Sequence, residues 1–397
     1  MDTPRLHAIF AGRDRTPLGR LARTAFGAAS PLYRTAIQAR NLTFDRGWRR
    51  AASLGRPTVS VGNLTAGGTG KTPMVIELVR RLVDRGHRPA VLLRGYFPRG
   101  SKPRVAKGST PYDMSDEAQL YRFALHGLAV AKASPDRRVA ARNALLEKPD
   151  TTVFILDDAF QRRQVRRDLD LVLIDATNPF GYGHVLPRGL LREPPRNLRR
   201  AHGVIVTRAD QVTEHERQQI DQQITDLIGR PATAHAAHRW TALLDADDQP
   251  LPLSHLKSQR VLGVCGIGNP ESFARHLAEH AGSLATARKP GEPSPDRLPG
   301  VRALNDHHAY RHDELTDMLR EAELRQADAL VTTEKDWVKW RPLLTDHPLP
   351  LPVLRPVLAM RFLDGEAAVD TLLEQLTLEE QEEPQMNTDE HRSEVRD

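Results

Sequence analysis

The sequence has only one cysteine, Cys265, among its 397 residues. One thiol cannot form an internal disulfide, so a fold held together by disulfides is excluded. The sequence also lacks, near its beginning, an apolar run long enough for a signal peptide or a membrane-spanning helix. We therefore expect a cytoplasmic protein that folds in a reducing compartment.

Acidic residues are fewer than basic ones, 51 against 57, which gives a net charge of +6. The positive charge comes from arginine more than from lysine, and planar guanidinium groups suit bidentate contacts to phosphate. Anionic partners are therefore favoured, and nucleic acid, an anionic lipid and a nucleotide all satisfy this composition. The length exceeds that of a typical domain, so we expect two domains that share a cleft.

The chain is organised around a glycine-rich stretch that follows a β-branched segment at Val59 and precedes an apolar-periodic helix expected at 74–83. In such a loop, backbone N–H groups converge on an anion. The lysine reaches the outer phosphates, and the hydroxyl after it holds Mg²⁺. The sequence therefore predicts a nucleotide cradle formed by Thr65, Ala66, Gly67, Gly68, Thr69, Gly70, Lys71 and Thr72.

The cradle departs at one position from the pattern G-x-x-x-x-G-K-[ST], because Thr65 stands where the first glycine belongs. The alternative is a glycine-rich hairpin that happens to precede a lysine. A strand before the loop and a helix after it favour phosphate binding, which is our working hypothesis.

Two adjacent carboxylates follow the wholly apolar segment 152–156, which predicts a central strand buried on both faces. Asp157 and Asp158 would then lie at the carboxyl end of that strand, at the sheet edge that also carries the phosphate loop. Nucleotide-dependent enzymes hold Mg²⁺ at this edge. We therefore predict that Thr72, Asp157 and Asp158 are metal ligands, the alternative being two loop acids without a ligand.

Three other patterns have competing interpretations. Asp116 begins the helix expected at 118–125, where capping alone would explain an acidic residue. The sequence Thr207-Arg208-Ala209-Asp210 is similar to the guanine-reading [NT]-K-x-D sequence of GTPases, with arginine in place of lysine. His307 and His308 are adjacent and would point in different directions on a strand, which favours a catalytic or phosphate-contacting histidine over a metal site.

Apolar residues recur at helical spacing from 17 to 37, with arginines interleaved. Ser30 followed by Pro31 is typical of an N-cap and a first turn, so we expect two helices that meet near Ser30. Two interpretations remain open: a helix packed on the domain, or a basic amphipathic surface at an anionic membrane.

Six motifs, in this order, resemble those of the tetraacyldisaccharide 4′-kinases of lipid A synthesis. They are 61–65 with 70–73, Asp157-Asp158-Ala159-Phe160-Gln161, Leu191-Arg192-Glu193-Pro194, Gly266-Ile267-Gly268-Asn269-Pro270, Asp306-His307-His308 and Thr333-Glu334-Lys335-Asp336. The resemblance extends from about residue 15 to 375. Arg162, Leu93 and Leu190 depart from it, because they stand where the family has histidine, serine and proline.

The predicted fold is α/β, with a P-loop NTPase-like, mostly parallel sheet and flanking helices, a smaller C-terminal α/β domain and an N-terminal amphipathic helix. The expected layout is a basic membrane-interface helix at 1–50 and a P-loop kinase core at 51–255. A C-terminal α/β domain at 256–375 would close the active-site cleft, and 376–397 would form a disordered acidic tail.

The resemblance implies transfer of the γ-phosphate of ATP, with Mg²⁺, to the 4′-hydroxyl of an acylated glucosamine disaccharide phosphate. It also implies a peripheral protein on the cytoplasmic face of the inner membrane, whose partners are this lipid and the anionic membrane surface, with no nucleic acid. The resemblance implies that Lys71 and Thr72 bind phosphate and Mg²⁺ and that Asp157 and Asp158 bind the metal. It also implies that Asp116 and His307 together activate the hydroxyl, and that Glu193 has a supporting role in the active site.

Two other functional classes use the same motifs. A GTPase or NTP-driven switch would prefer GTP through Asp210. An arginine-rich nucleic-acid-binding protein would lose affinity steeply as salt rises. Neither class explains the second glycine-turn segment and its histidines.

Overall fold

The computed structural model describes residues 3–95, 115–286, 296–306, 308–344 and 349–382. In this part of the chain, a first unit is built on strands that run parallel to one another. These strands are β1 (Thr58–Asn63), β2 (Pro89–Leu93), β3 (Val130–Ala133), β4 (Val153–Asp157), β5 (Leu169–Asp175), β6 (Gly203–Thr207) and β7 (Ala234–Leu244). Their order across the sheet is β7-β6-β5-β1-β4-β2-β3, so β1 is central and the loop after it lies in the middle of the edge.

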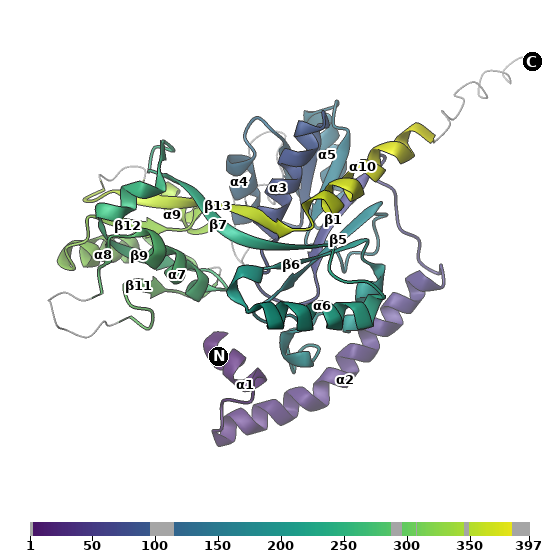
Figure 1. The fold of residues 1–397 in the computed structure, drawn as a ribbon, viewed down its shortest axis with the longest axis horizontal. Coiled ribbons are helices and arrows are strands. Elements are labelled where there is room, and N and C mark those ends of the chain that lie inside the picture. Colours follow the sequence, from purple (N-terminus) through teal and green to yellow (C-terminus); the bar gives the residue numbers. More distant parts are fainter. Residues whose placement is uncertain (1–2, 96–114, 287–295, 307, 345–348, 383–397) are drawn as a thin grey trace, which may run out of the picture.

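Helices cover both faces of this sheet (Figure 1). Helices α3 (Lys71–Asp84), α4 (Asp116–Ala124) and α10 (Glu366–Glu382) share a core with one face. Helices α5 (Arg137–Glu147) and α6 (Glu214–Ile228) pack on the opposite face. The predicted α/β fold with a mostly parallel sheet and flanking helices is confirmed.

A second, smaller unit continues the same sheet. Its elements are β8 (Pro250–Leu251), β9 (Arg260–Cys265), α7 (Pro270–His280), β10 (Ser283–Leu284), β11 (Val301–Ala303), α8 (His312–Leu324), β12 (Ala329–Thr332) and α9 (Glu334–Leu344), and β13 (Val353–Asp364) follows them. The long strand β13 runs antiparallel to β7 and parallel to β12, so β7 and β13 form a two-stranded ribbon that joins the units (Figure 1). The second unit is thus inserted between two strands of the first.

The domain limits drawn from the sequence remain a proposal, and the packing of the last helix suggests a different limit. Val369 and Leu373 of α10 are buried in the core of the first unit, in the same cluster as Val59 and Leu78. We therefore propose that the first unit includes residues from β13 onward. Helix α10 also continues to Glu382, past the expected start of a disordered tail at 376, and residues 383–397 lie outside the described residues.

The N-terminal region forms a short helix, α1 (Thr3–Phe10), and one long helix, α2 (Pro17–Asp45), that crosses the lower side of the first unit (Figure 1). The prediction that two helices meet near Ser30 is wrong, because α2 continues through Pro31. The Ser30 hydroxyl caps no helix. It donates instead to the carbonyl oxygen of Val185, 2.8 Å away, and this contact holds α2 against the first unit.

Candidate active site

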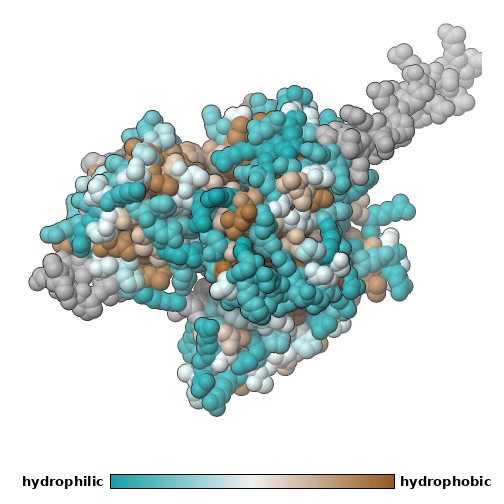
Figure 2. All heavy atoms as spheres, in the orientation of Figure 1, coloured by the Kyte–Doolittle hydropathy of each residue, from teal (hydrophilic) through white to brown (hydrophobic). Residues whose placement is uncertain are grey.

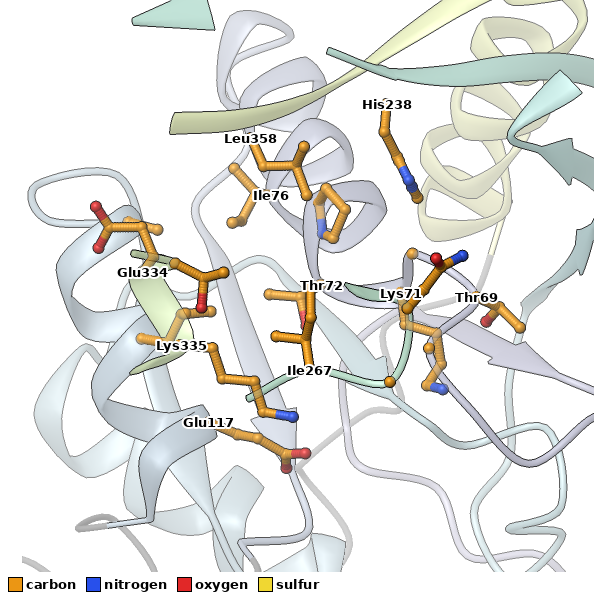
Figure 3. A pocket seen from close by; sticks show the side chains of 18 of the residues that line it. Thr69, Lys71, Thr72, Ile76, Glu117, His238, Ile267, Glu334, Lys335 and Leu358 are labelled. Carbon is orange, nitrogen blue, oxygen red and sulfur yellow. The ribbon is translucent and has the colours of Figure 1, made fainter. Parts of the chain in front are cut away.

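A cavity of about 880 Å³ lies at the carboxyl end of the first unit's strands, between the two units. The first unit contributes the phosphate loop, from Gly67 to Pro73, and the two carboxylates of Asp157 and Asp158 to its lining. The second unit contributes Gly268 and Lys335, and Figure 3 shows Lys335 and Thr72 on facing sides of this space. Residues predicted from separate motifs therefore meet in one cleft.

The phosphate loop is held by side chains from the strands beside it. The Asn63 amide donates to the Thr65 carbonyl at 2.7 Å and to the Thr69 hydroxyl at 3.0 Å. The Thr207 hydroxyl donates to the Thr69 carbonyl at 2.9 Å, and Arg208 donates to the Gly68 carbonyl at 2.6 Å. Because side chains of neighbouring segments bind these carbonyl groups, contacts within the protein fix the conformation of the phosphate loop.

Thr65, the residue that departs from the usual glycine, is buried and bridges to Leu191 in an antiparallel contact. Its methyl group lies against Gly181, where an added Cβ would come within 3.0 Å of it. A second chain segment therefore occupies the space beside the loop and accommodates the larger side chain.

Gly70 is required by two independent features. Its φ of +85° is a left-handed conformation, and an added Cβ would lie 2.2 Å from Nε2 of His238. We expect Gly70→Ala to destabilise the protein by about 1–3 kcal/mol, because alanine is strained in this conformation and meets a buried ring. Gly68→Ala is the matched control, since a Cβ there meets nothing within 4 Å. Thermal unfolding without nucleotide measures both, and equal midpoints would contradict this account.

Asp158 is held between two cations. The Arg192 guanidinium donates to its two oxygens at 2.7 and 2.8 Å, and the Lys71 ammonium lies 3.5 Å away. Burial raises the pKa of Asp158, but Lys71 and Arg192 outweigh burial and lower that pKa to about 2. The residue adopts a left-handed φ of 51°, as short polar side chains do at functional turns. Asp158 is therefore a fixed carboxylate at neutral pH.

Asp157 and Thr72 meet at the hydroxyl of Tyr121. This hydroxyl donates to Oδ2 of Asp157 at 3.0 Å, and it is also hydrogen-bonded to the Thr72 side chain. The other oxygen of Asp157, Oδ1, is buried and has no hydrogen-bond partner. An unpartnered buried carboxylate oxygen beside a threonine hydroxyl fits the oxygen ligands that Mg²⁺ prefers.

In the described part of the chain, no group of three or more His, Cys, Asp or Glu side chains is placed to hold a metal ion. Nucleotide enzymes bind Mg²⁺ by one or two carboxylates together with phosphate oxygens of the substrate, so such a cluster is not needed. We therefore keep Thr72, Asp157 and Asp158 as the proposed ligands.

Glu117, in the first turn of α4, also lines the cavity. Burial, and next the charge of Asp157, raise its pKa to about 7, while Lys335 and Lys71 oppose the shift. Figure 3 shows its carboxylate and the ammonium of Lys335 pointing toward one another across the cavity. The signal available in the sequence was its place directly after Asp116, at the start of a helix that faces the cleft.

Asp116 also lines the cavity, at the first position of α4, where Ser115 forms the N-cap. Its Oδ2 lies 3.5 Å from the ammonium of Lys339, which comes from α9 of the second unit. His307, its predicted partner, lies outside the described residues, so the pairing stays a prediction. The neighbouring His308 has a different partner, Glu314, at 2.9 Å.

Glu193 has a different environment from the other predicted site residues. It is buried, and its carboxylate accepts hydrogen bonds from Asn41, Gln161, Asn197 and Arg200. Gln161 also donates to the carbonyl of Asn63, at the end of β1. Glu193 therefore joins α2, the segment after Asp158 and the end of β1, and we propose a positioning role for it.

Two further residues touch the phosphate loop, and the sequence marked one of them, Arg208, only as part of a possible guanine-reading pattern. Arg208 forms an ion pair with Asp175 while it binds the Gly68 carbonyl. His238, on β7, packs on Gly70, and its Nε2 is buried without a hydrogen-bond partner. Burial lowers the pKa of His238 to about 3, so the ring is neutral. No local pattern in the sequence marks His238, because only the course of β7 brings it to the loop.

Comparisons with known proteins agree with this arrangement. The sequence profile of the family described as Tetraacyldisaccharide-1-P 4'-kinase matches residues 22–377. A tetraacyldisaccharide 4'-kinase of Anaeromyxobacter dehalogenans is 38% identical over 345 residues, which cover 85% of this chain and 87% of the relative. The enzyme of the same name from Geobacter sulfurreducens is 36% identical over 375 residues, or 92% of this chain and 98% of the relative.

A solved structure is similar over most of its length. It is the "apo" form of LpxK from Aquifex aeolicus in complex with ATP, which is 26% identical, with a TM-score of 0.62, and the match covers 89% of this chain and 99% of that one. The motifs, the fold and these relatives agree, and the chain belongs to the tetraacyldisaccharide 4′-kinase family.

Proposed function

We propose that the protein transfers the γ-phosphate of ATP to the 4′-hydroxyl of a tetraacyldisaccharide 1-phosphate, the step that forms the lipid IVA precursor of lipid A. Family membership over residues 22–377 carries this conclusion. The cleft adds the physical support, because a phosphate loop, two carboxylates and a lysine line one space.

Phosphoryl transfer depends mainly on positioning and on stabilising charge, and the described residues suit both tasks. Backbone N–H groups of the phosphate loop bind the phosphates, and Lys71 adds a positive charge where negative charge develops. Mg²⁺, held by Thr72, Asp157 and Asp158, would supply charge neutralisation on the phosphate oxygens. Asp116, which lines the same cavity, is the proposed acceptor of the proton of the sugar hydroxyl.

The GTPase alternative receives no support from the site. Asp210, which would read guanine, lies 3.2 Å from the guanidinium of Arg239. Arg208, at the lysine position of the guanine-reading sequence, is bound to Asp175 and to the phosphate loop. The four-residue match is therefore explained by contacts inside the protein.

A transfer assay tests the function directly. The purified protein is incubated with γ-labelled ATP and Mg²⁺ and with an acylated disaccharide 1-phosphate in detergent micelles. Label in the lipid, which is lost when a 4′-deoxy or already 4′-phosphorylated lipid is used, is the expected result. ATP hydrolysis that ignores the lipid would contradict the proposal.

We further propose that α2 lies on the anionic cytoplasmic face of the inner membrane. Among the described residues, no helix has the length and apolar content needed to cross a bilayer. Leu18, Leu21 and Leu32 of α2 are 55%, 67% and 74% exposed, and Figure 2 shows hydrophilic atoms beside paler ones along the lower edge where α2 lies. Exposed leucines with interleaved arginines suit an interfacial helix, and each arginine near the surface adds about 1 kcal/mol.

Replacing Leu18, Leu21 and Leu32 by aspartate is expected to release the protein from anionic vesicles in a sedimentation assay, since it removes apolar contacts and adds negative charge. The matched control is Leu146→Asp, because Leu146 is 75% exposed on α5. The control should sediment like the wild type. Unchanged binding by the triple variant would show that α2 is not the anchor.

A further inference from the structure

Helix α2 is attached to the active-site segments by hydrogen bonds as well as by packing. On its inner face, the hydroxyl of Tyr33 donates to the carbonyl of Arg192 at 3.0 Å, and the Asn41 amide donates to Glu193 at 3.2 Å. Arg40 donates to the carbonyl of Gln161. These partners belong to the two chain segments that carry Asp158 and Arg192. One face of α2 therefore binds the segments that hold Asp158, a proposed metal ligand, in place.

Arg192 is held from three directions. Its N–H donates to the carbonyl of Leu64 at 2.7 Å, directly before the phosphate loop. Its carbonyl accepts from Tyr33, and its guanidinium holds both oxygens of Asp158. Tyr33 is therefore connected to Asp158 through Arg192, and Asp158 in turn lies 3.5 Å from Lys71.

The outer side of the same helix turn carries Leu32, which is 74% exposed. Adjacent residues of a helix point in different directions, so Tyr33 faces the site while Leu32 faces away from it. The ring of Tyr33 packs on the apolar cluster around Leu191 and Leu198, and its hydroxyl is the one polar group it brings to that surface.

We propose that Tyr33 is a positioning residue for phosphoryl transfer: its hydroxyl fixes the Arg192 backbone, and Arg192 in turn fixes Asp158 at the phosphate loop. The inference rests on the proposed kinase function and is independent of whether α2 binds a membrane. Helix α2 is then part of the catalytic unit. An account of α2 as an anchor alone leaves its hydrogen bonds to Arg192 and Glu193 unexplained.

Tyr33→Phe tests this role because it removes one oxygen and keeps the packed ring. We expect kcat to fall about 5- to 10-fold, the size of one lost hydrogen bond, with KM for ATP and for the lipid within about 2-fold of the wild type. Thr35→Val is the matched control, since the Thr35 hydroxyl donates only to Pro31 within the helix. The control should keep the wild-type kcat, and both variants should sediment with vesicles like the wild type and remain folded at the assay temperature.

A double-mutant cycle with Arg192→Lys separates positioning from general stability. Lysine keeps the charge but replaces the rigid, planar guanidinium, whose Nη1 contacts both oxygens of Asp158, by a flexible ammonium group. If Tyr33 acts through Arg192, Tyr33→Phe costs much less in the Arg192→Lys background than in the wild type. A Tyr33→Phe variant with unchanged kcat, or with a loss that adds in full to that of Arg192→Lys, overturns the proposal. Absence of lipid phosphorylation by the wild type would instead overturn the function.

Discussion

Lys71→Ala is expected to lower turnover by at least about 100-fold, the usual effect of removing one preorganised electrostatic group. Lys71 is the cation at the end of the phosphate loop, and its ammonium lies 3.5 Å from Asp158 at the edge of the cavity. The variant loses the charge that would stabilise the transferred phosphoryl group. Single-turnover rates of transfer to the lipid, at saturating ATP, measure the chemical step.

The control for this variant is Lys335→Ala, which removes another lysine that lines the same cavity. Lys335 lies 2.7 Å from Asp306 in the second unit. We expect a smaller loss from this change, because Lys335 is on the wall opposite the phosphate loop. Near-normal turnover by Lys71→Ala, in protein with a wild-type unfolding midpoint, would refute the phosphate-cradle assignment.

Asp116→Asn and His307→Ala are each expected to slow the chemical step strongly while ATP binding is largely kept. A lone carboxylate is a poor base for a sugar hydroxyl, and a neighbouring imidazole could share the proton and orient it. The double variant should then lose little more than the worse single variant, because residues that act as one unit are non-additive.

Helix capping gives a different expectation for the same variants. Ser115 already caps α4, and Asp116 is its first residue. If Asp116 only favours the helix start, asparagine should keep most of the activity, and the effect of His307→Ala should simply add. Single-turnover rates of the two single variants and of the double variant distinguish helix capping from a joint role of Asp116 and His307. Additive losses would contradict the joint role.

Local sequence predicted the residues whose roles depend on short spacing. Lys71 and Thr72 follow a glycine loop, and Asp157 and Asp158 follow an apolar strand, so each pair is placed by the element beside it. Parallel strands carry their carboxyl ends to one edge, which is why two distant motifs were expected to meet there. The cleft lined by these residues agrees with that expectation.

The course of α2 and the contacts of His238 and Tyr33 depend on packing between distant segments, which the local sequence does not predict. Pro31 indicated a helix boundary, but Ser30 is bound to Val185, and α2 continues across the first unit. His238 reaches Gly70 only because β7 extends past the sheet edge toward the second unit. Tyr33 acquires its contact with Arg192 across more than 150 positions of sequence, and helical periodicity carries no information about that partner.

The insertion of the second unit between β7 and β13 sets the order in which the protein can be completed during synthesis. The phosphate loop and α3 are made before the second unit, whereas β13 and α10, which complete the core around α3, are made after it. Domains generally fold as units as they emerge, so the first unit has to wait for the second. A growing chain that ends before Val353 therefore carries the whole phosphate loop on an unfinished core, and that core is completed only after β13 and α10 have been made.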